Sequence, residues 1–133
     1  MQPDEKLRVA YFENFPDYDR LVITYLAAIA VEADYKADLH EVLASKEATY
    51  NAIITEMHSE LGVRDNAGLE RAQELEVLGL PIIIFTSESV DKASEKNWRS
   101  QYKLGENVVF ISKNDIQLKE FAQQVKALAT QKR

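Results

Sequence analysis

Polar side chains that could do chemistry come directly after short apolar runs of the chain: Glu13, Asn14, Glu56, Thr86 and Lys113. Carboxylate and amide oxygens are ligands for hard divalent cations such as Mg²⁺. An ammonium group and a hydroxyl group suit the oxygens of a phosphoryl group. If these side chains met, they would form a site for a cation and a phosphoryl group. Whether they meet depends on the elements that carry them.

The apolar runs have the length and composition of β-strands. We predict strands at residues 7–12, 52–55, 81–85 and 107–112. The run at 81–85 is the strongest, and it belongs in the interior of a sheet because strands covered on both faces are continuously apolar. A weaker run at residues 39–43 is predicted to be the second strand in chain order.

Between the strands, apolar residues recur at helical spacing. The predicted helices are residues 17 to about 33, with Asp17 as N-cap; residues 69–78, ending at Gly79; a polar helix from Ser89 or Asp91 to about Gly105; and a last helix capped by Asn114 or Asp115 and reaching Leu128. Residues 46–49 leave room for one helical turn at most, so we expect the second helix to be nearly absent.

Alternating strands and helices with short connections require right-handed crossovers. The expected fold is therefore α/β, a doubly wound, five-stranded parallel sheet of the flavodoxin-like kind. Its 133 residues are expected to form one domain with a core at about residues 7–128. Ligands of such sheets bind outside the carboxyl ends of the strands, where the polar side chains lie.

Composition excludes several classes of function. The chain has 16 Lys and Arg against 22 Asp and Glu, a net charge of −6, which disfavours direct binding to nucleic acid or an anionic membrane. The absence of cysteine rules out disulfides, thiolate metal sites and cysteine nucleophiles. The N-terminus lacks a signal-peptide pattern, and no apolar run approaches the ~18 residues of a membrane span. We therefore expect a cytoplasmic protein.

Five segments taken together resemble the receiver domain of two-component response regulators: residues 9–16, 52–57, 68–70, 82–87 and 108–113. The resemblance runs from residue 7 to about residue 128. It implies a receiver fold and a site with two acids after the first strand, a phospho-accepting Asp after the third, Ser or Thr after the fourth and Lys after the fifth. Thr86 and Lys113 match this pattern.

The chain departs from the pattern at the other site positions. Glu13 stands for the first acid, Asn14 for the second and Glu56 for the phospho-acceptor, and the residue after Lys113 is Asn114 instead of Pro. A Glu carboxylate lies one methylene further out than that of Asp, and in-line phosphoryl transfer tolerates little misplacement. The resemblance thus implies a degenerate phosphorylation site without a bound cofactor, although weak Mg²⁺ binding through Glu13 and Glu56 remains open.

The functional hypothesis is a non-enzymatic pseudo-receiver that signals through protein contacts. Glu56 is expected to pair with Lys113 and so to imitate the charge of a phosphorylated Asp. The expected interface, for a protein partner or a homodimer, comprises the polar helix, the fifth strand and the last helix. Phe110 matches the family's aromatic switch position or is a core residue, and Trp98 and Tyr102 form either a partner anchor or half-buried packing.

Two other functions stay open. One is a phospho-accepting, Mg²⁺-dependent receiver, and the other is a flavodoxin-like small-molecule binder with residues 57–68 as a pocket wall. These residues could also have no function at a site. Glu13 and Glu56 would then be ordinary surface acids, and the hydroxyl of Thr86 would satisfy a backbone group. His40 and His58 lack metal-ligand spacing and are expected to be solvated or structural.

Overall fold

The computed structural model describes residues 7–12, 16–35, 38–44, 50–58 and 66–130. Its strands are β1 (Leu7–Phe12), β2 (Val31–Tyr35), β3 (Ala52–Thr55), β4 (Ile82–Thr86) and β5 (Val108–Ser112). Its helices are α1 (Pro16–Ala27), α2 (Leu39–Ala44), α3 (Ala67–Leu75), the short 3-10 helix η1 (Glu76–Leu78), α4 (Lys92–Tyr102) and α5 (Leu118–Ala129). The strands form one parallel sheet in the order β2-β1-β3-β4-β5. The predicted fold class is confirmed.

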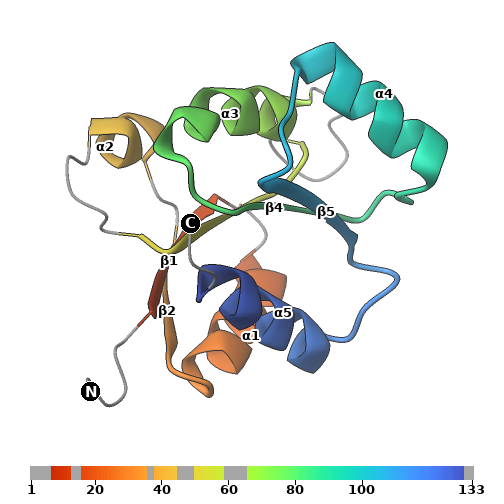
Figure 1. Ribbon diagram of the computed structural model, residues 1–133. Coiled ribbons are helices and arrows are strands. Elements are labelled where there is room, and N and C mark those ends of the chain that lie inside the picture. The colour runs from red at the N-terminus through yellow and green to blue at the C-terminus, as the bar shows by residue number, and fades with distance from the viewer. Residues whose placement is uncertain (1–6, 13–15, 36–37, 45–49, 59–65, 131–133) are drawn as a thin grey trace.

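Helices cover both faces of the sheet (Figure 1). Successive side chains of a strand point to opposite faces, so Val9 and Tyr11 pack toward α1 and α5, whereas Ala10 and Phe12 pack toward α2, α3 and α4. The rings of Phe85 and Phe121 stack with centroids 3.7 Å apart and join β4 to α5. No helix among the described residues is long and apolar enough to cross a membrane.

The strand register brings four carboxyl ends to the same edge of the sheet, although β4 extends two residues beyond Ile84, the partner of Thr55 at the end of β3. Phe12 is paired with Thr55, and Thr86 at the end of β4 is paired with Ser112 at the end of β5. The backbone carbonyl of Phe12 also accepts a hydrogen bond from the amide of Glu56 at 3.0 Å. Residues that follow β1, β3, β4 and β5 therefore start from the same edge of the sheet, as the sequence predicts.

The predicted second strand is wrong. Residues 39–43 belong to helix α2, so the second helix, expected to be nearly absent, is a six-residue helix that precedes residues 46–49. The second strand is β2, which begins within the helix predicted through about residue 33. Helix α1 ends at Ala27, and Ala30 takes the left-handed conformation with φ 65°, which turns the chain into pairing with β1. Only Val31 of β2 is buried, so this edge strand lacks the apolar alternation that identifies a strand.

Asp17 is not the N-cap predicted for the first helix, because α1 begins at Pro16 and includes it. The bounds of α3 with η1 and of α4 lie within about three residues of the prediction. Helix α3 and η1 end at Gly79, which has φ 69°, and Asp91 caps α4 by accepting a hydrogen bond from the Ser94 amide at 2.7 Å. Helix α5 begins at Leu118 with Gln117 as N-cap, not Asn114 or Asp115. Asn114 is used otherwise, because its side-chain amide bonds the carbonyl of Ser87.

A polar cluster holds the edge strand. Tyr50 donates a 2.7 Å hydrogen bond to Asp34 of β2, and Arg8 of β1 pairs with the same carboxylate. The guanidinium of Arg8 also lies 5.2 Å from the centre of the Tyr50 ring. Burial of the phenol and its bond to Asp34 raise the pKa of Tyr50 to about 12.

Gly68 allows α3 to approach the residues that follow β3. Its amide donates a 2.7 Å hydrogen bond to the carbonyl of Met57. A Cβ atom at this position would lie 1.7 Å from the carbonyl oxygen of Glu56 and 2.7 Å from the Cα of Met57. The close contact with Glu56 is possible only because residue 68 has no side chain.

The phenol of Tyr50 should ionise late in an alkaline titration followed by phenolate absorbance. Its folded pKa lies above the ordinary value of about 10, so its contribution to stability is complete below pH ~10 and is lost as the pH rises through about 12. Tyr50→Phe should remove the step near pH 12, and Asp34→Asn should shift it to lower pH. A late step that persists in Tyr50→Phe would contradict the assignment.

Replacing Gly68 should destabilise the protein by overpacking. Gly68→Ala is expected to lower the free energy of unfolding by about 3 kcal/mol, because backbone must move to admit the methyl group. Gly79→Ala is the matched control, because it has open space and suffers only from its positive φ, at about 1 kcal/mol. Urea unfolding followed by the fluorescence of Trp98 measures both, and equal losses would refute the steric argument.

Candidate functional site

The carboxyl edge of the sheet carries an ion pair that is largely withdrawn from water. The ammonium Nζ of Lys113 lies 2.5 Å from Oε2 of Glu56. The two side chains are only 12% and 6% exposed. The contact expected between these residues is present, although they are 57 positions apart in the chain. Glu56 is therefore not an ordinary surface acid, which was the alternative interpretation of this residue.

Aromatic rings complete the surroundings of Lys113. Its Nζ lies 4.7 Å from the centre of the Tyr18 ring and 5.4 Å from that of Phe85. The faces of aromatic rings attract cations, so the ammonium group is stabilised by these rings as well as by Glu56. Tyr18 comes from the first turn of α1 and Phe85 from β4, so Lys113, which follows β5, contacts α1, β4 and the residue after β3.

The residues next to Glu56 are also bound. Its second carboxylate oxygen, Oε1, accepts a 3.0 Å hydrogen bond from the amide of Met57. The hydroxyl of Thr55 donates to the carbonyl of Glu56 at 3.1 Å and accepts from Arg71 of α3 at 2.6 Å. Both carboxylate oxygens of Glu56 thus have hydrogen-bond donors, and its backbone is held by α3.

Thr86 is fully buried at the end of β4, and its hydrogen bonds are to backbone amides. Its hydroxyl oxygen accepts a 3.1 Å hydrogen bond from the amide of Glu88, and its carbonyl accepts a 2.7 Å bond from the amide of Lys113. The hydroxyl role matches the interpretation in which Thr86 satisfies a backbone group. The residue therefore shapes the turn after β4 and ties it to the chain after β5.

The turn after β4 is held from two sides. His58 pairs with the carboxylate of Glu88 through Nε2, and the amide of Asn114 donates a 2.8 Å hydrogen bond to the carbonyl of Ser87. Of the two interpretations of His58, the structural one fits. These contacts join the loops that follow β3, β4 and β5.

The described part of the site does not fit a divalent cation. Among the described residues no group of three His, Cys, Asp or Glu side chains could hold a metal ion. The oxygens of Glu56 face an ammonium group and an amide instead. Glu13 and Asn14, predicted to line the site, lie outside the described residues, as do residues 59–65 of the predicted pocket wall.

The predicted switch residues lie on the other side of the sheet. Phe110 of β5 stacks on Trp98 of α4 with centroids 5.3 Å apart, and the guanidinium of Arg99 lies 5.2 Å from the Phe110 ring. Trp98 and Tyr102 are half-buried against the α2, α3 and α4 side of the core. The rings beside Lys113, those of Tyr18 and Phe85, instead belong to the α1 and α5 side.

Sequence reasoning missed several partners of the site. Tyr18 and Phe85 flank the ammonium group of Lys113, Arg71 holds Thr55, and Glu88 with Asn114 fixes the loops. A weak signal existed for two of them, because Phe85 immediately precedes Thr86 and Asn114 follows Lys113. Nothing in the sequence pairs Arg71 with Thr55 or His58 with Glu88.

The chain is similar to known proteins in its fold but not detectably in its sequence. No protein-family model matches the chain, and no curated protein matches it. Solved structures do match. The non-phosphorylated HemR receiver domain of Leptospira biflexa superposes with a TM-score of 0.70 at 15% identity, covering 96% of this chain and 98% of that one.

Other matches are of the same kind. The chemotaxis protein CheY4 of Vibrio cholerae has a TM-score of 0.67 at 14% identity, with 93% and 99% of the two chains covered. HP1043, an orphan response regulator of H. pylori, has a TM-score of 0.64 at 15% identity, with 92% and 96% covered. The chain therefore has the CheY-like, flavodoxin-like fold of response-regulator receiver domains.

Proposed function

We propose that this chain is a pseudo-receiver, a signalling module that acts through protein contacts and does not depend on phosphorylation. The observation that carries the proposal is the 2.5 Å contact between Glu56 and Lys113. The position that matches a phospho-acceptor is occupied by a carboxylate already neutralised by the site's own lysine. The proposed role is non-enzymatic, and the lack of cysteine is typical of a protein in a reducing compartment such as the cytoplasm.

The geometry disfavours phosphoryl transfer to Glu56. A carboxylate oxygen that attacks a phosphoryl donor needs an approach in line with the leaving group. Here Oε2 faces Lys113 and Oε1 faces the Met57 amide. The hydroxyl of Thr86 accepts a hydrogen bond from Glu88 and shapes the turn. Of the groups that would act on a phosphoryl group, Glu56 and Lys113 are thus engaged with each other.

Strand β5 supplies the link from this site to a surface. Lys113 follows β5 directly, and Phe110 within β5 stacks on Trp98 of α4. Because Glu56 holds Lys113 in place, the proposed interface formed by α4, β5 and α5 keeps a single conformation that does not depend on a bound phosphoryl group. In this proposal the face recognises its partner constitutively. The concentration of the partner, and not phosphorylation of this chain, then controls how much complex forms.

Incubation with acetyl phosphate and Mg²⁺ should leave the intact mass of the purified protein unchanged. A phosphorylatable receiver domain treated in parallel checks the donor, and Glu56→Gln provides the matched variant. One added phosphoryl group that is lost in Glu56→Gln would overturn the proposal in favour of a Mg²⁺-dependent phospho-accepting receiver. Added mass retained in Glu56→Gln would locate phosphorylation at another residue and would overturn it as well.

Removing one partner of the ion pair should be costly, because it leaves the other charge buried. Glu56→Gln or Lys113→Met alone is expected to lower the free energy of unfolding by about 3 kcal/mol. The double variant should lose less than the sum, with a coupling of about 2 kcal/mol. Urea unfolding of the four proteins completes the cycle.

Glu32→Gln is the control for this cycle. Glu32 and Arg8 form a pair 3.9 Å apart with side chains about 40% exposed, and such exposed pairs contribute less than about 1 kcal/mol. Strictly additive losses for Glu56 and Lys113 would show that the two side chains do not depend on each other.

A further inference from the structure

Helix α4 is basic on an acidic protein. Between residues 92 and 103 the chain has four cations, Lys92, Lys96, Arg99 and Lys103, and one acid, Glu95, so this segment carries a net charge of +3. The whole chain carries −6. The electrostatic potential near this helix therefore opposes that of the rest of the surface.

Arg99 is engaged within the structure. Its Nε bonds Glu95 at 2.7 Å, and its two terminal nitrogens donate to the carbonyls of Gly105 at 2.9 Å and Val108 at 2.6 Å. Glu95 and Arg99 thus neutralise each other and fasten α4 to the outer edge of β5. Lys92, Lys96 and Lys103 form no ion pair with any residue that the structure describes, and all three are exposed.

The positions of the lysines do not favour the helix itself. Lys92 is the first residue of α4, where the helix dipole disfavours a cation. Lys92 and Lys96 are four residues apart, so their charges repel on the same helix face. Asp91 compensates in part by capping α4, and its bond from the Ser94 amide lowers the pKa of Asp91. Side chains that break local helix rules in this way are expected at functional sites.

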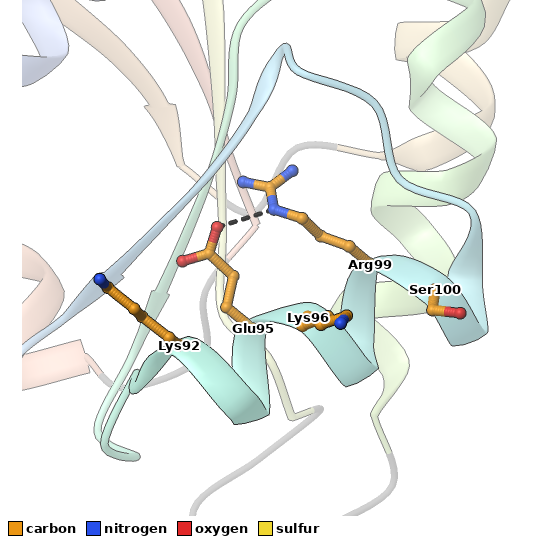
Figure 2. Close-up of a pocket in the computed structure, with 5 residues that line it drawn as sticks. All are labelled: Lys92, Glu95, Lys96, Arg99 and Ser100. Atoms are coloured by element: carbon orange, nitrogen blue, oxygen red, sulfur yellow. Dashed lines mark hydrogen bonds and ion pairs between the residues drawn. The ribbon is translucent and has the colours of Figure 1, made fainter.

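Lys92 and Lys96, but not Lys103, border an open hollow on the protein surface. Lys92, Glu95, Lys96, Arg99 and Ser100 line a volume of about 510 Å³. Figure 2 shows Glu95 and Arg99 reaching toward each other, with Lys92 beside Glu95 and with Lys96 and Ser100 further along the helix. From Lys92 to Lys103 the basic surface extends ~16 Å along the helix.

We propose that this α4 hollow binds an acidic segment of a partner protein. Three unpaired ammonium groups spread over ~16 Å suit several carboxylates along an extended or helical segment better than one small anion. Nucleic acid fits poorly, because the net charge of −6 repels its backbone. The inference rests on the proposed function in that it names the chemistry of the partner at the α4 face.

The hollow is connected to β5 through its own lining. Arg99 contacts both the Val108 carbonyl and the Phe110 ring, and Trp98 stacks on that ring. Trp98 is the only tryptophan of the chain. Binding beside Arg99 should therefore change the fluorescence of Trp98, which gives a signal from α4 that charge changes elsewhere do not produce.

The test uses the full chain and a fluorescein-labelled peptide of alternating Glu and Ala, about 12 residues long. We expect binding in fluorescence anisotropy together with a change in Trp98 emission. Lys92→Glu with Lys96→Glu should weaken binding at least about tenfold, whereas Lys92→Arg with Lys96→Arg should keep it. Arg20→Glu is the control for Lys92→Glu alone, because Arg20 is exposed, lies on α1 outside the proposed interface, and gives the same change in net charge.

Several results would overturn the inference. These are no binding to the wild type, equal loss in the control variant, or displacement of the peptide by inorganic phosphate at equal concentration. Self-association in sedimentation that disappears in Lys92→Glu with Lys96→Glu would make a second copy the occupant and also overturn it. Binding by a protein whose mass shows phosphorylation would refute only the proposed function, and an unphosphorylated protein that fails to bind would refute only this inference.

Discussion

A carboxylate and an ammonium group that are both withdrawn from water are stable only when they face each other. Glu56 and Lys113 follow β3 and β5, which lie on either side of β4, so their pairing depends on the register of three strands. Three other features surround this pair: α3 approaches Glu56 closely at Gly68, the chain turns at Thr86, and the ring of Tyr18 lies beside the ammonium group of Lys113. The carboxyl edge of the sheet is built around this contact.

Residues in and directly after β5 contact both sides of the sheet. Lys113 lies among rings of the α1 and α5 side, whereas Phe110, three residues earlier, packs against α4. An odd separation in a strand places side chains on opposite faces, so the ion pair and helix α4 lie on opposite sides of the sheet and are joined through the backbone of β5. Arg99 completes the link because it bonds the outer edge of β5 and also lines the α4 hollow.

The parts of the fold that the sequence predicts are those with strong apolar periodicity. The runs that became β1, β3, β4 and β5 are mostly apolar, apart from Arg8 in β1 and the hydroxyl residue that ends each of the other three, because helices cover both of their faces. β2 was missed because an edge strand with one buried residue has no such pattern. The cap of α5 was missed because Asn114, a good capping residue, bonds Ser87 across the site, a contact 27 residues away that no local rule can anticipate.

The sequence by itself determined the chemistry available: a Glu where the resembling family has Asp, a Thr and a Lys after apolar strands, and a basic helix in an acidic chain. These properties follow from residue type and from the period of the apolar pattern. The tertiary structure alone decided which groups meet. Glu56 faces Lys113, His58 faces Glu88, and Lys92 and Lys96 face solvent, because the choice of partner depends on strand order and helix packing between residues far apart in the chain.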